Sequence, residues 1–304
     1  MAVTTVLGPV PAAELGRTLM HEHLLADRFR VSGKDDYVLL DRQLAAVELA
    51  AYAGAGGRTL VDLTVPDFGR DPEALAHLSQ VTGVQIVMGA GWYHEKYYPP
   101  EIDRSSVDAL ARSLVAEFEH GVGDTGIRPG IIGELGAGET GGWMTAQEER
   151  VFRAAGRAQR AIGCPVTTHA FRTRVGMDQV AVLKEEGADP RSIIVGHCDS
   201  IEDPGFHEAL AATGAWVQFD LLRATAEEDI RKKVEVVVEF WRRGHADAML
   251  LSQDVCMKSH LRAYGGMGYT GLFDCYEPRL LEAGLPAEVF HQVVEVNPAR
   301  VFGS

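Results

Sequence analysis

Short apolar runs rich in β-branched residues recur along the chain, and a longer segment with helical spacing follows each of them. The predicted strands are TLMHEH (18–23), TLVDLTV (59–65), VQIVMGAG (84–91), GIIGELG (130–136), PVTTHA (165–170), SIIVGHCD (192–199), AWVQFD (215–220) and AMLLSQD (248–254). Amphipathic, alanine-rich segments such as 42–53, 146–163 and 227–244 are the predicted helices between them. The pattern therefore predicts eight consecutive strand–helix units.

The fold class follows from the continuously apolar character of these strands. Strands of this kind, separated by helices, are typical of a parallel sheet that helices cover. Eight units favour a closed (β/α)8 TIM barrel over an open doubly wound sheet, which is the second choice. No GxGxxG motif follows the first strand and no P-loop pattern occurs, so the nucleotide-binding forms of the open sheet lose support. A chain of 304 residues suits one such barrel.

Two long irregular stretches, 93–106 and 255–278, follow the third and eighth predicted strands. In a β/α barrel the loops after the strands form the catalytic face. We therefore expect both stretches in the wall of a substrate pocket.

Charge and composition limit the partners. A formal net charge of -14 argues against general binding to nucleic acid or an anionic membrane, so a small-molecule substrate is expected. No run approaches about 18 apolar residues, and the N-terminal segment lacks the features of a signal peptide, which indicates a cytoplasmic protein. The four cysteines are widely spaced, form no CxxC pair and are expected as reduced thiols.

Histidines and carboxylates gather at the C-terminal ends of the predicted strands, where a β/α barrel places its active site. His21 and His23 alternate at period two in HEH, so both side chains are expected on one face, ready to bind a metal. Glu22 should then point the other way. Glu134 interrupts an apolar strand, and burying a carboxylate there is costly unless it is paired or bound to metal.

The remaining candidate ligands end later strands. His169 follows VTT, His197 follows IIVG, and Asp254 closes LLSQD. Taken singly, each histidine is equally explained as a hydrogen-bonded core residue, and Asp254 as a helix cap. Six such residues together suit two divalent cations about 3.5–4 Å apart, bridged by Glu134 and a hydroxide. Among the other histidines, His94 and His260 are expected at the pocket, whereas His120, His207 and His291 are expected in solvent.

Over nearly its whole length, the sequence resembles the phosphotriesterase family of the amidohydrolase superfamily. The motifs that carry the resemblance are MHEHL, GAGWY, GIIGELG, TTHA, GHCD, VQFD, LSQD, MKSHL and the closing VNPARVFG. The resemblance implies one barrel domain over residues 1–304. It also implies that His21, His23 and Asp254 hold one metal, that His169 and His197 hold the other, and that Glu134 bridges them.

Two departures from the family pattern affect the expected substrate. The organophosphate-degrading and lactone-hydrolysing branches bridge their metals with a carboxylated lysine, whereas this chain has Glu134, as in the phosphotriesterase-related branch. The organophosphate hydrolases also carry a relay histidine after the seventh strand, where this chain has Leu221. Tyr93 matches a loop tyrosine of the lactonase branch that touches the substrate, and an aromatic side chain that only packs the loop is the alternative.

These observations predict a binuclear metal-dependent hydrolase with zinc as the expected metal and manganese or cobalt as alternatives. The bridging hydroxide would attack a carboxylic ester, lactone or amide, and Asp254 would transfer the proton. Lys258 and Arg223 follow metal-side strands and are the candidate contacts for an anionic substrate group, with solvated loop charges as the alternative. The alternatives are an organophosphate hydrolase and a metal-containing binding protein without turnover. A homodimer is left open as the assembly.

Overall fold

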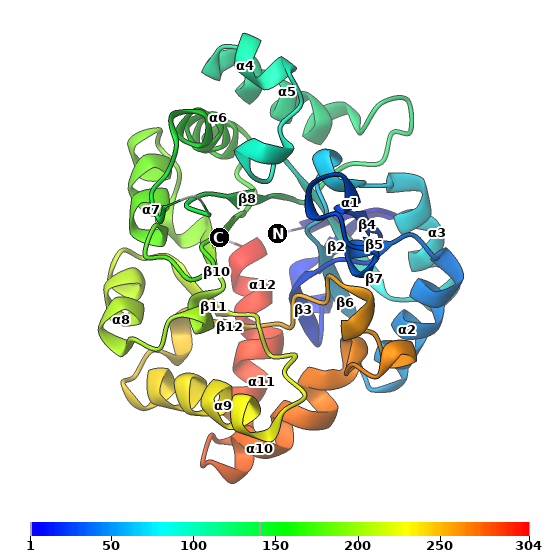
Figure 1. The fold of residues 1–304 in the computed structure, drawn as a ribbon, viewed down its shortest axis with the longest axis vertical. Coiled ribbons are helices and arrows are strands. Elements are labelled where there is room, and N and C mark those ends of the chain that lie inside the picture. Colours follow the sequence, from blue (N-terminus) through cyan, green and yellow to red (C-terminus); the bar gives the residue numbers. More distant parts are fainter. Residues whose placement is uncertain (1, 140, 304) are drawn as a thin grey trace.

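The chain forms a ring of eight parallel strands surrounded by helices (Figure 1), in a computed structural model that describes residues 2–139 and 141–303. The strands of the ring are β3 (Thr18–Glu22), β6 (Thr59–Asp62), β7 (Gln85–Ala90), β8 (Ile131–Gly136), β9 (Val166–His169), β10 (Ile193–Gly196), β11 (Trp216–Phe219) and β12 (Met249–Leu251). Neighbours pair in parallel and in sequence order from β3 to β12. The predicted (β/α)8 barrel is confirmed, and the open sheet is excluded.

The first and last strands close the ring through backbone groups at their C-terminal ends. The Asp254 amide donates to the His21 carbonyl at 3.0 Å, and the His23 amide donates to the Val255 carbonyl at 3.1 Å. A buried carboxyl group strengthens this seam, because Glu22 accepts from the Gln253 amide at 2.9 Å and from the Val255 amide at 2.7 Å. Glu22 thus points away from its neighbouring histidines, as predicted.

Helices cover the outside of the ring and connect its strands. They are α2 (Arg42–Gly54), α3 (Pro72–Thr82), α5 (Val107–His120), α6 (Ala146–Ile162), α7 (Gly176–Glu185), α8 (Pro204–Ala212) and α9 (Glu227–Arg242). The start of α6 shows why these boundaries were predictable: Thr145 and Glu148 form a reciprocal capping box, and Gly163 ends the helix in a left-handed conformation. None of the helices in residues 2–139 and 141–303 is long and apolar enough to cross a membrane.

One end of the barrel is sealed by the two ends of the chain. Side chains from the strands fill the interior, among them Met20, Val61 and Ile194, and they pack in one cluster with Val3 and Phe302. Val3 belongs to β1 (Ala2–Thr5), which pairs with β2 (Gly8–Pro11). Phe302 belongs to α12 (Asn297–Phe302), which lies near the centre of Figure 1. The remaining helices after β12 are α10 (Glu277–Glu282) and α11 (Ala287–His291). The sealed end leaves the C-terminal ends of the strands as the accessible face.

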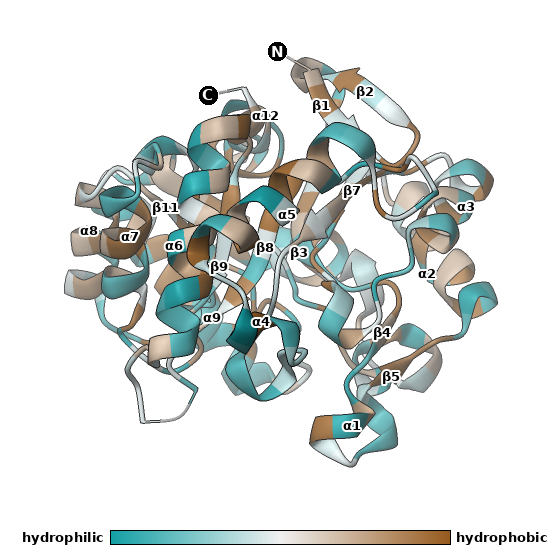
Figure 2. Cartoon of the chain, turned by 90° about the horizontal axis from the view of Figure 1, so that it is seen from above, coloured by the Kyte–Doolittle hydropathy of each residue, from teal (hydrophilic) through white to brown (hydrophobic). Residues whose placement is uncertain are grey.

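A small excursion covers part of that accessible face. It consists of β4 (Ala26–Asp27), α1 (Phe29–Ser32) and β5 (Val38–Leu39), with β4 and β5 paired antiparallel. We call residues 26–39 the flap. Figure 2 shows the flap at the opposite end of the molecule from β1, β2 and α12. A second short helix after a strand, α4 (Glu101–Arg104), lies within the predicted loop 93–106.

Candidate metal centre

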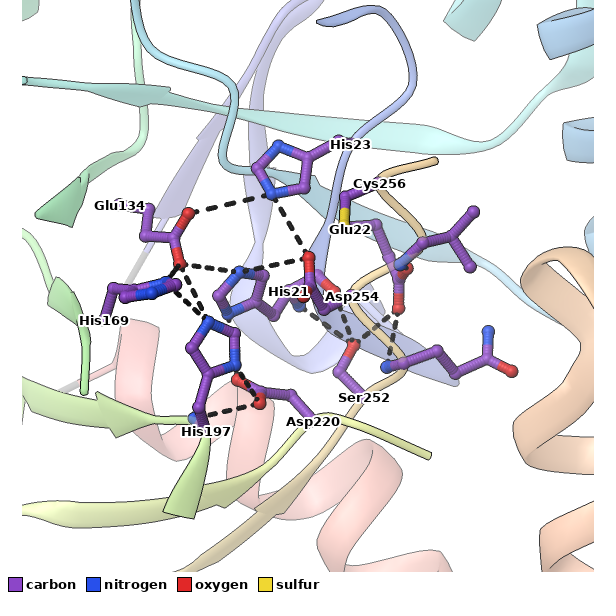
Figure 3. Close-up of polar contacts among 12 residues, drawn as sticks. His21, Glu22, His23, Glu134, His169, His197, Asp220, Ser252, Asp254 and Cys256 are labelled. Carbon is purple, nitrogen blue, oxygen red and sulfur yellow. Dashed lines mark hydrogen bonds and ion pairs between the residues drawn. The ribbon is translucent and has the colours of Figure 1, made fainter. Parts of the chain in front are cut away.

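The six predicted ligands converge at the C-terminal ends of the strands (Figure 3). Three ligands lie within strands: His21 on β3, Glu134 on β8 and His169 at the end of β9. The other three follow a strand end by one to three residues. They are His23 after β3, His197 after β10 and Asp254 after β12. They form two groups of possible ligands, one of His21, His23 and Asp254 and one of Glu134, His169 and His197. The arrangement brings together all six residues proposed from the sequence.

Glu134 lies at the centre of the cluster. Its Oε1 is 2.6 Å from His169 Nδ1, 3.1 Å from His197 Nε2 and 3.3 Å from His21 Nε2. Its Oε2 faces the other group and is 3.7 Å from His23 Nε2. One carboxylate therefore offers an oxygen to each group of ligands, as a bridging ligand must.

The donor set fits two divalent cations. Imidazole nitrogens and carboxylate oxygens suit zinc and similar borderline metals. Moreover, His21 Nε2 is buried and has no hydrogen-bond partner among the described residues, although it faces Glu134 and Asp254. A buried polar atom without a partner is costly, and a bound cation would remove that cost.

An outer layer of groups orients the imidazole rings. Asp220 lies 2.9 Å from His21 Nδ1 and 2.7 Å from His197 Nδ1, and the Thr64 hydroxyl lies 3.0 Å from His23 Nδ1. Because each outer nitrogen is engaged, the Nε2 atoms of all three rings are directed at the centre. Asp220 was not proposed as a site residue from the sequence, although its position at the end of a strand is the same signal that identified the ligands.

Burial and charge set the protonation of the centre. Burial alone would raise the pKa of Glu134, but His21 and His169 hold it well below its usual range. Burial would also raise the pKa of Asp254, but Arg223 keeps it well below its usual range. Burial lowers the pKa of His169 to about 4. The two carboxylates are thus ionised at neutral pH and His169 is neutral, the states that bind metal.

His197 and His21 differ from His169: burial would lower their pKa values, but Asp220 raises that of His197 to about 9, and Glu134 with Asp220 raises that of His21. A cation would displace the proton from each of these two rings as it binds.

Three non-glycine residues of the described chain have a left-handed backbone, and two of them are ligands. The φ angles are 58° at His197, 50° at Asp254 and 55° at Arg172. Such conformations are costly for residues with a Cβ and concentrate at functional sites. They also explain why the strands end before His197 and Asp254, since the chain leaves the ladder where it turns each ligand inward.

A cavity of about 610 Å³ lies over the ligands and is the place for a substrate. His169, His197 and Asp254 lie at its base, and both long loops contribute to its wall, with Tyr97 from the first and Met257 from the second. The flap supplies a further side, which the sequence analysis did not anticipate. Its two-residue strands carry no periodicity that would reveal them.

Two of the three predicted substrate contacts line this cavity. The Tyr93 hydroxyl lies 3.3 Å from both ring nitrogens of His169, and Arg223 Nη1 lies 2.5 Å from Asp254 Oδ2. Lys258 does not line it. Its side chain borders a separate apolar cavity with Leu39 and Tyr269, because the short helical turn after Met257 carries it away from the ligands.

The other histidines correct part of the sequence analysis. His94 and His260 are not part of the cavity lining; His94 instead packs edge-on against His169, at 5.0 Å between ring centres, with Nδ1 3.1 Å from Glu148 Oε1. His207 is buried rather than solvated, and its Nε2 lies 2.9 Å from the Cys198 carbonyl oxygen. His120 and His291 are exposed, as expected.

A β/α barrel with a two-metal ligand set at its open end defines the class of metal-dependent hydrolases. Within that class the chain belongs to the Phosphotriesterase family, whose sequence model matches residues 1–302. The N-acetyltaurine hydrolase of Rattus norvegicus is 31% identical to it, with 98% of this chain and 97% of that protein covered.

Two solved structures show the same fold along the whole chain. A resiniferatoxin-binding protein from Rhodobacter sphaeroides superposes with a TM-score of 0.91 at 33% identity, covering 99% of this chain and 94% of the other. A lactonase from Listeria monocytogenes superposes with a TM-score of 0.90 at 27% identity, covering 99% of each chain. The chain is therefore similar to proteins whose names include an amide hydrolase, a lactonase and a binding protein.

Proposed function

We propose that this metal-dependent hydrolase cleaves a carboxylic ester, a lactone or an amide of a small molecule. The observation that carries the proposal is the position of Asp254. One of its oxygens faces His23 at 3.4 Å, while Arg223 holds the other at 2.5 Å, and the residue borders the cavity. A carboxylate that is ionised, oriented and open to the substrate is equipped to accept a proton during hydrolysis.

The cluster would hold one cation with His21, His23 and Asp254 and a second with His169 and His197, with Glu134 shared by both. When bound, such cations lower the pKa of water and polarise the electrophilic centre of the substrate. Zinc is the proposed metal, because imidazole and carboxylate suit it, with manganese and cobalt as alternatives.

The residues of the chain then position the substrate and move the proton. Burial, reinforced by Glu134, raises the pKa of Tyr93 well above its usual value, so its hydroxyl stays protonated and can donate to a substrate oxygen. Arg223 Nη1 also donates to the carbonyl oxygens of Gln253 and Asp254, at 2.9 and 2.6 Å, which fixes the orientation of the Asp254 carboxylate. Asp254 accepts the proton and passes it to the leaving group.

The residues at the end of the seventh strand favour a carbonyl carbon over a phosphotriester as the centre of attack. Asp220 is committed to His21 and His197, and the next residue, Leu221, has no proton to exchange. The names of the relatives support the same choice, since one is an N-acetyltaurine hydrolase and another a lactonase. Phosphotriester hydrolysis is the second candidate, and the name of the Rhodobacter sphaeroides protein supports a binding function as a third.

The first test is elemental analysis of the purified protein after growth with added zinc or manganese. We expect about two equivalents of metal per chain, and a clear loss of metal in Glu134→Ala. Protein without tightly held metal would refute the two-metal centre.

The second test compares metal-loaded protein and its Asp254→Asn variant on aryl esters, lactones, N-acetyl amino acids and a phosphotriester. Removing the proton acceptor should lower kcat by about 100-fold or more while metal content stays near two equivalents. The matched control is Asp229→Asn, an exposed residue of α9, which should leave kcat unchanged. Full turnover in Asp254→Asn, or preference for the phosphotriester, would contradict the proposal, and tight binding without turnover would favour the binding function.

A further inference from the structure

The cavity over the candidate metal centre has a surplus of positive side chains, although the whole chain carries a net charge of -14. The cationic lining residues are Arg28, Lys34, Lys96, Arg172 and Arg223. Two of them are neutralised within the cavity, because Lys96 pairs with Glu139 and Arg223 pairs with Asp254, each at 2.5 Å. The other three have no carboxylate within ion-pair distance among residues 2–139 and 141–303.

Arg28 is the best placed of these three. Its Nη2 donates to the Cys256 carbonyl at 2.8 Å, and its guanidinium lies 4.7 Å from the centre of the Tyr37 ring. Nε is buried without an acceptor. Nη1 is not fully buried, and beyond the contacts of the guanidinium with the Cys256 carbonyl and thiol it has no hydrogen bond among the described residues. The guanidinium is thus held in place from two sides, and its free edge belongs to a residue that lines the cavity.

Lys34 and Arg172 extend the positive charge to the mouth of the cavity. Both are exposed, with Lys34 on the flap and Arg172 in the loop after β9. Arg172 has the left-handed backbone that it shares only with His197 and Asp254 among the described non-glycine residues, and the Ser200 hydroxyl accepts its amide at 2.8 Å. Retention of this costly conformation beside the cavity is consistent with a role for the residue there.

We infer that the cavity binds an anionic group of the substrate, a carboxylate, sulfonate or phosphate monoester, on Arg28, with Lys34 and Arg172 drawing the anion in. A guanidinium with a free edge is suited to these groups because its N–H bonds match their oxygens in geometry and charge. The inference deepens the proposed function, on which it rests, because the anion and the bond to be cleaved belong to one molecule.

The position of Arg28 also limits the separation between the anion and the bond to be cleaved. Arg28 is bonded to the carbonyl of Cys256, only two residues beyond Asp254. Anion and scissile bond are therefore expected near each other, which points to N-acyl or O-acyl acids with few atoms between the anion and the cleaved bond, rather than to uncharged lactones.

Hydrolysis by the metal-loaded protein tests the inference with N-acetyl substrates that carry either an anionic or a neutral end group. The anionic probes are N-acetyl-β-alanine, N-acetyltaurine and N-acetylethanolamine phosphate, and the neutral partner is N-acetyl-β-alaninamide. We expect kcat/KM for at least one anionic probe to exceed that of the neutral amide by about tenfold or more. The three anionic probes show whether carboxylate, sulfonate or phosphate is preferred.

The variants Arg28→Met and Arg28→Lys assign the preference to this side chain. Methionine keeps much of the length without the charge, so the anionic-to-neutral ratio of kcat/KM should fall by about tenfold or more, and lysine should restore part of it. Arg42→Met is the matched control, since Arg42 is exposed on α2 and pairs with Asp71 on the outside of the barrel. A ratio that stays constant in folded Arg28→Met overturns the inference. If that variant does not fold, the inference is overturned when Arg28→Lys and Lys34→Met both keep the wild-type anionic-to-neutral ratio of kcat/KM.

A binding measurement separates failure of this inference from failure of the proposed function. Calorimetry on metal-loaded protein would compare 1-butanesulfonate with the neutral 1-butanesulfonamide. Suppose that anion binding weakens about tenfold or more in Arg28→Met and that the protein cleaves none of the substrates. This result would support the anion site and refute the proposed hydrolysis. Cleavage of the neutral amide without any anion preference or Arg28-dependent binding refutes the anion site alone.

Discussion

Asp220 shows how much one side chain beyond the ligands contributes to a metal centre. It is fully buried and contacts an outer nitrogen of one histidine from each group of ligands, His21 and His197. Burial alone would raise its pKa, but these two histidines lower it, so the residue is an anion that can accept hydrogen bonds from both rings.

The variant Asp220→Asn should therefore weaken metal binding. An amide replaces one acceptor oxygen by a donor, so one of the two rings loses its partner and its orientation. Loss of such a partner typically costs about 10–100-fold in metal affinity, which competition with a chelator of known strength would measure. Asp178→Asn, on the exposed side of α7, is the control and should bind metal normally. Equal affinities in the two variants would show that Asp220 does not orient the ligands.

Asp67 predicts a pH dependence of stability. Burial raises its pKa to about 7, and its only hydrogen bond among the described residues joins Oδ2 to the Tyr93 amide at 2.9 Å, while Oδ1 has no partner. Because the folded pKa exceeds the unfolded one, the folded state holds the proton more tightly. The stabilisation is complete below about pH 4 and is lost as the pH rises through 7.

Asp67→Asn should remove this dependence, because asparagine resembles the protonated acid. At pH 8 the variant should be more stable than the wild type by on the order of 1–3 kcal/mol, and near pH 4 the two should agree. Urea unfolding at both pH values measures the difference. A constant difference from pH 4 to pH 8 would rule out titration of Asp67 as the cause.

The ligands were predictable from the sequence, and their partners largely were not. A histidine or carboxylate at the end of an apolar strand is conspicuous, which identified His21, His169 and Asp254. Asp220 has the same placement but was overlooked in favour of Leu221, which follows it. Arg28 gave no signal, since it follows a two-residue strand in an irregular stretch and reaches the cavity only through the folding of the flap.

At the level of elements, backbone hydrogen bonds join β3 to the residues just beyond β12, and Glu22 spans this seam. Burial raises the pKa of Glu22 to about 8. The predicted consequence is that Glu22→Gln destabilises the fold at about pH 9, where the Glu22 carboxylate is ionised and only accepts hydrogen bonds. The NH2 group of the glutamine must face the backbone N–H of either Gln253 or Val255, both of which now donate to Glu22. The Ser252 hydroxyl, which now donates to Glu22 at 2.8 Å, can rotate to accept instead, but a backbone amide cannot. An unsatisfied buried donor costs about 1–3 kcal/mol.

Chemical unfolding of metal-loaded protein would measure that loss, with Glu288→Gln on the exposed face of α11 as the control. A variant as stable as the control would mean that the backbone bonds between the two strands are sufficient to close the barrel.

The eight strands were predictable because each is a continuous apolar run, but their ends were not. The predicted strand 248–254 ends at Leu251 in the structure, and 192–199 ends at Gly196. In both, the residues beyond the strand turn inward at Asp254 and His197, a backbone change that hydrophobicity does not encode. The pair of β1 and β2 was missed as well, since each strand has only four residues and β2 contains Gly8, Pro9 and Pro11, which show no strand periodicity.

On the scale of the whole molecule, the metal centre joins ligands from β3, β8 and β9 with residues that follow β10 and β12. Bound cations should therefore stabilise the barrel as a unit. At a thousandfold excess over the dissociation constant, one bound ligand contributes about 4 kcal/mol. Removal of metal by a chelator should lower the melting temperature by roughly 5–10 °C.

Scanning calorimetry before and after chelation measures this shift, and re-addition of zinc should restore it. The Glu134→Ala variant should respond less, because it lacks the carboxylate shared by the two groups of ligands. An identical response in both proteins would indicate that the chelator acts at another place on the molecule.

The sealed end of the barrel has a practical consequence. Ala2 and Gly303 both lie there, beside β1 and α12 and away from the flap (Figure 2). A protein attached to a surface or joined to a reporter through either end would keep its cavity turned to the solution. Such attachment is a direct way to immobilise the protein in an oriented layer in which every cavity is open to incoming substrate.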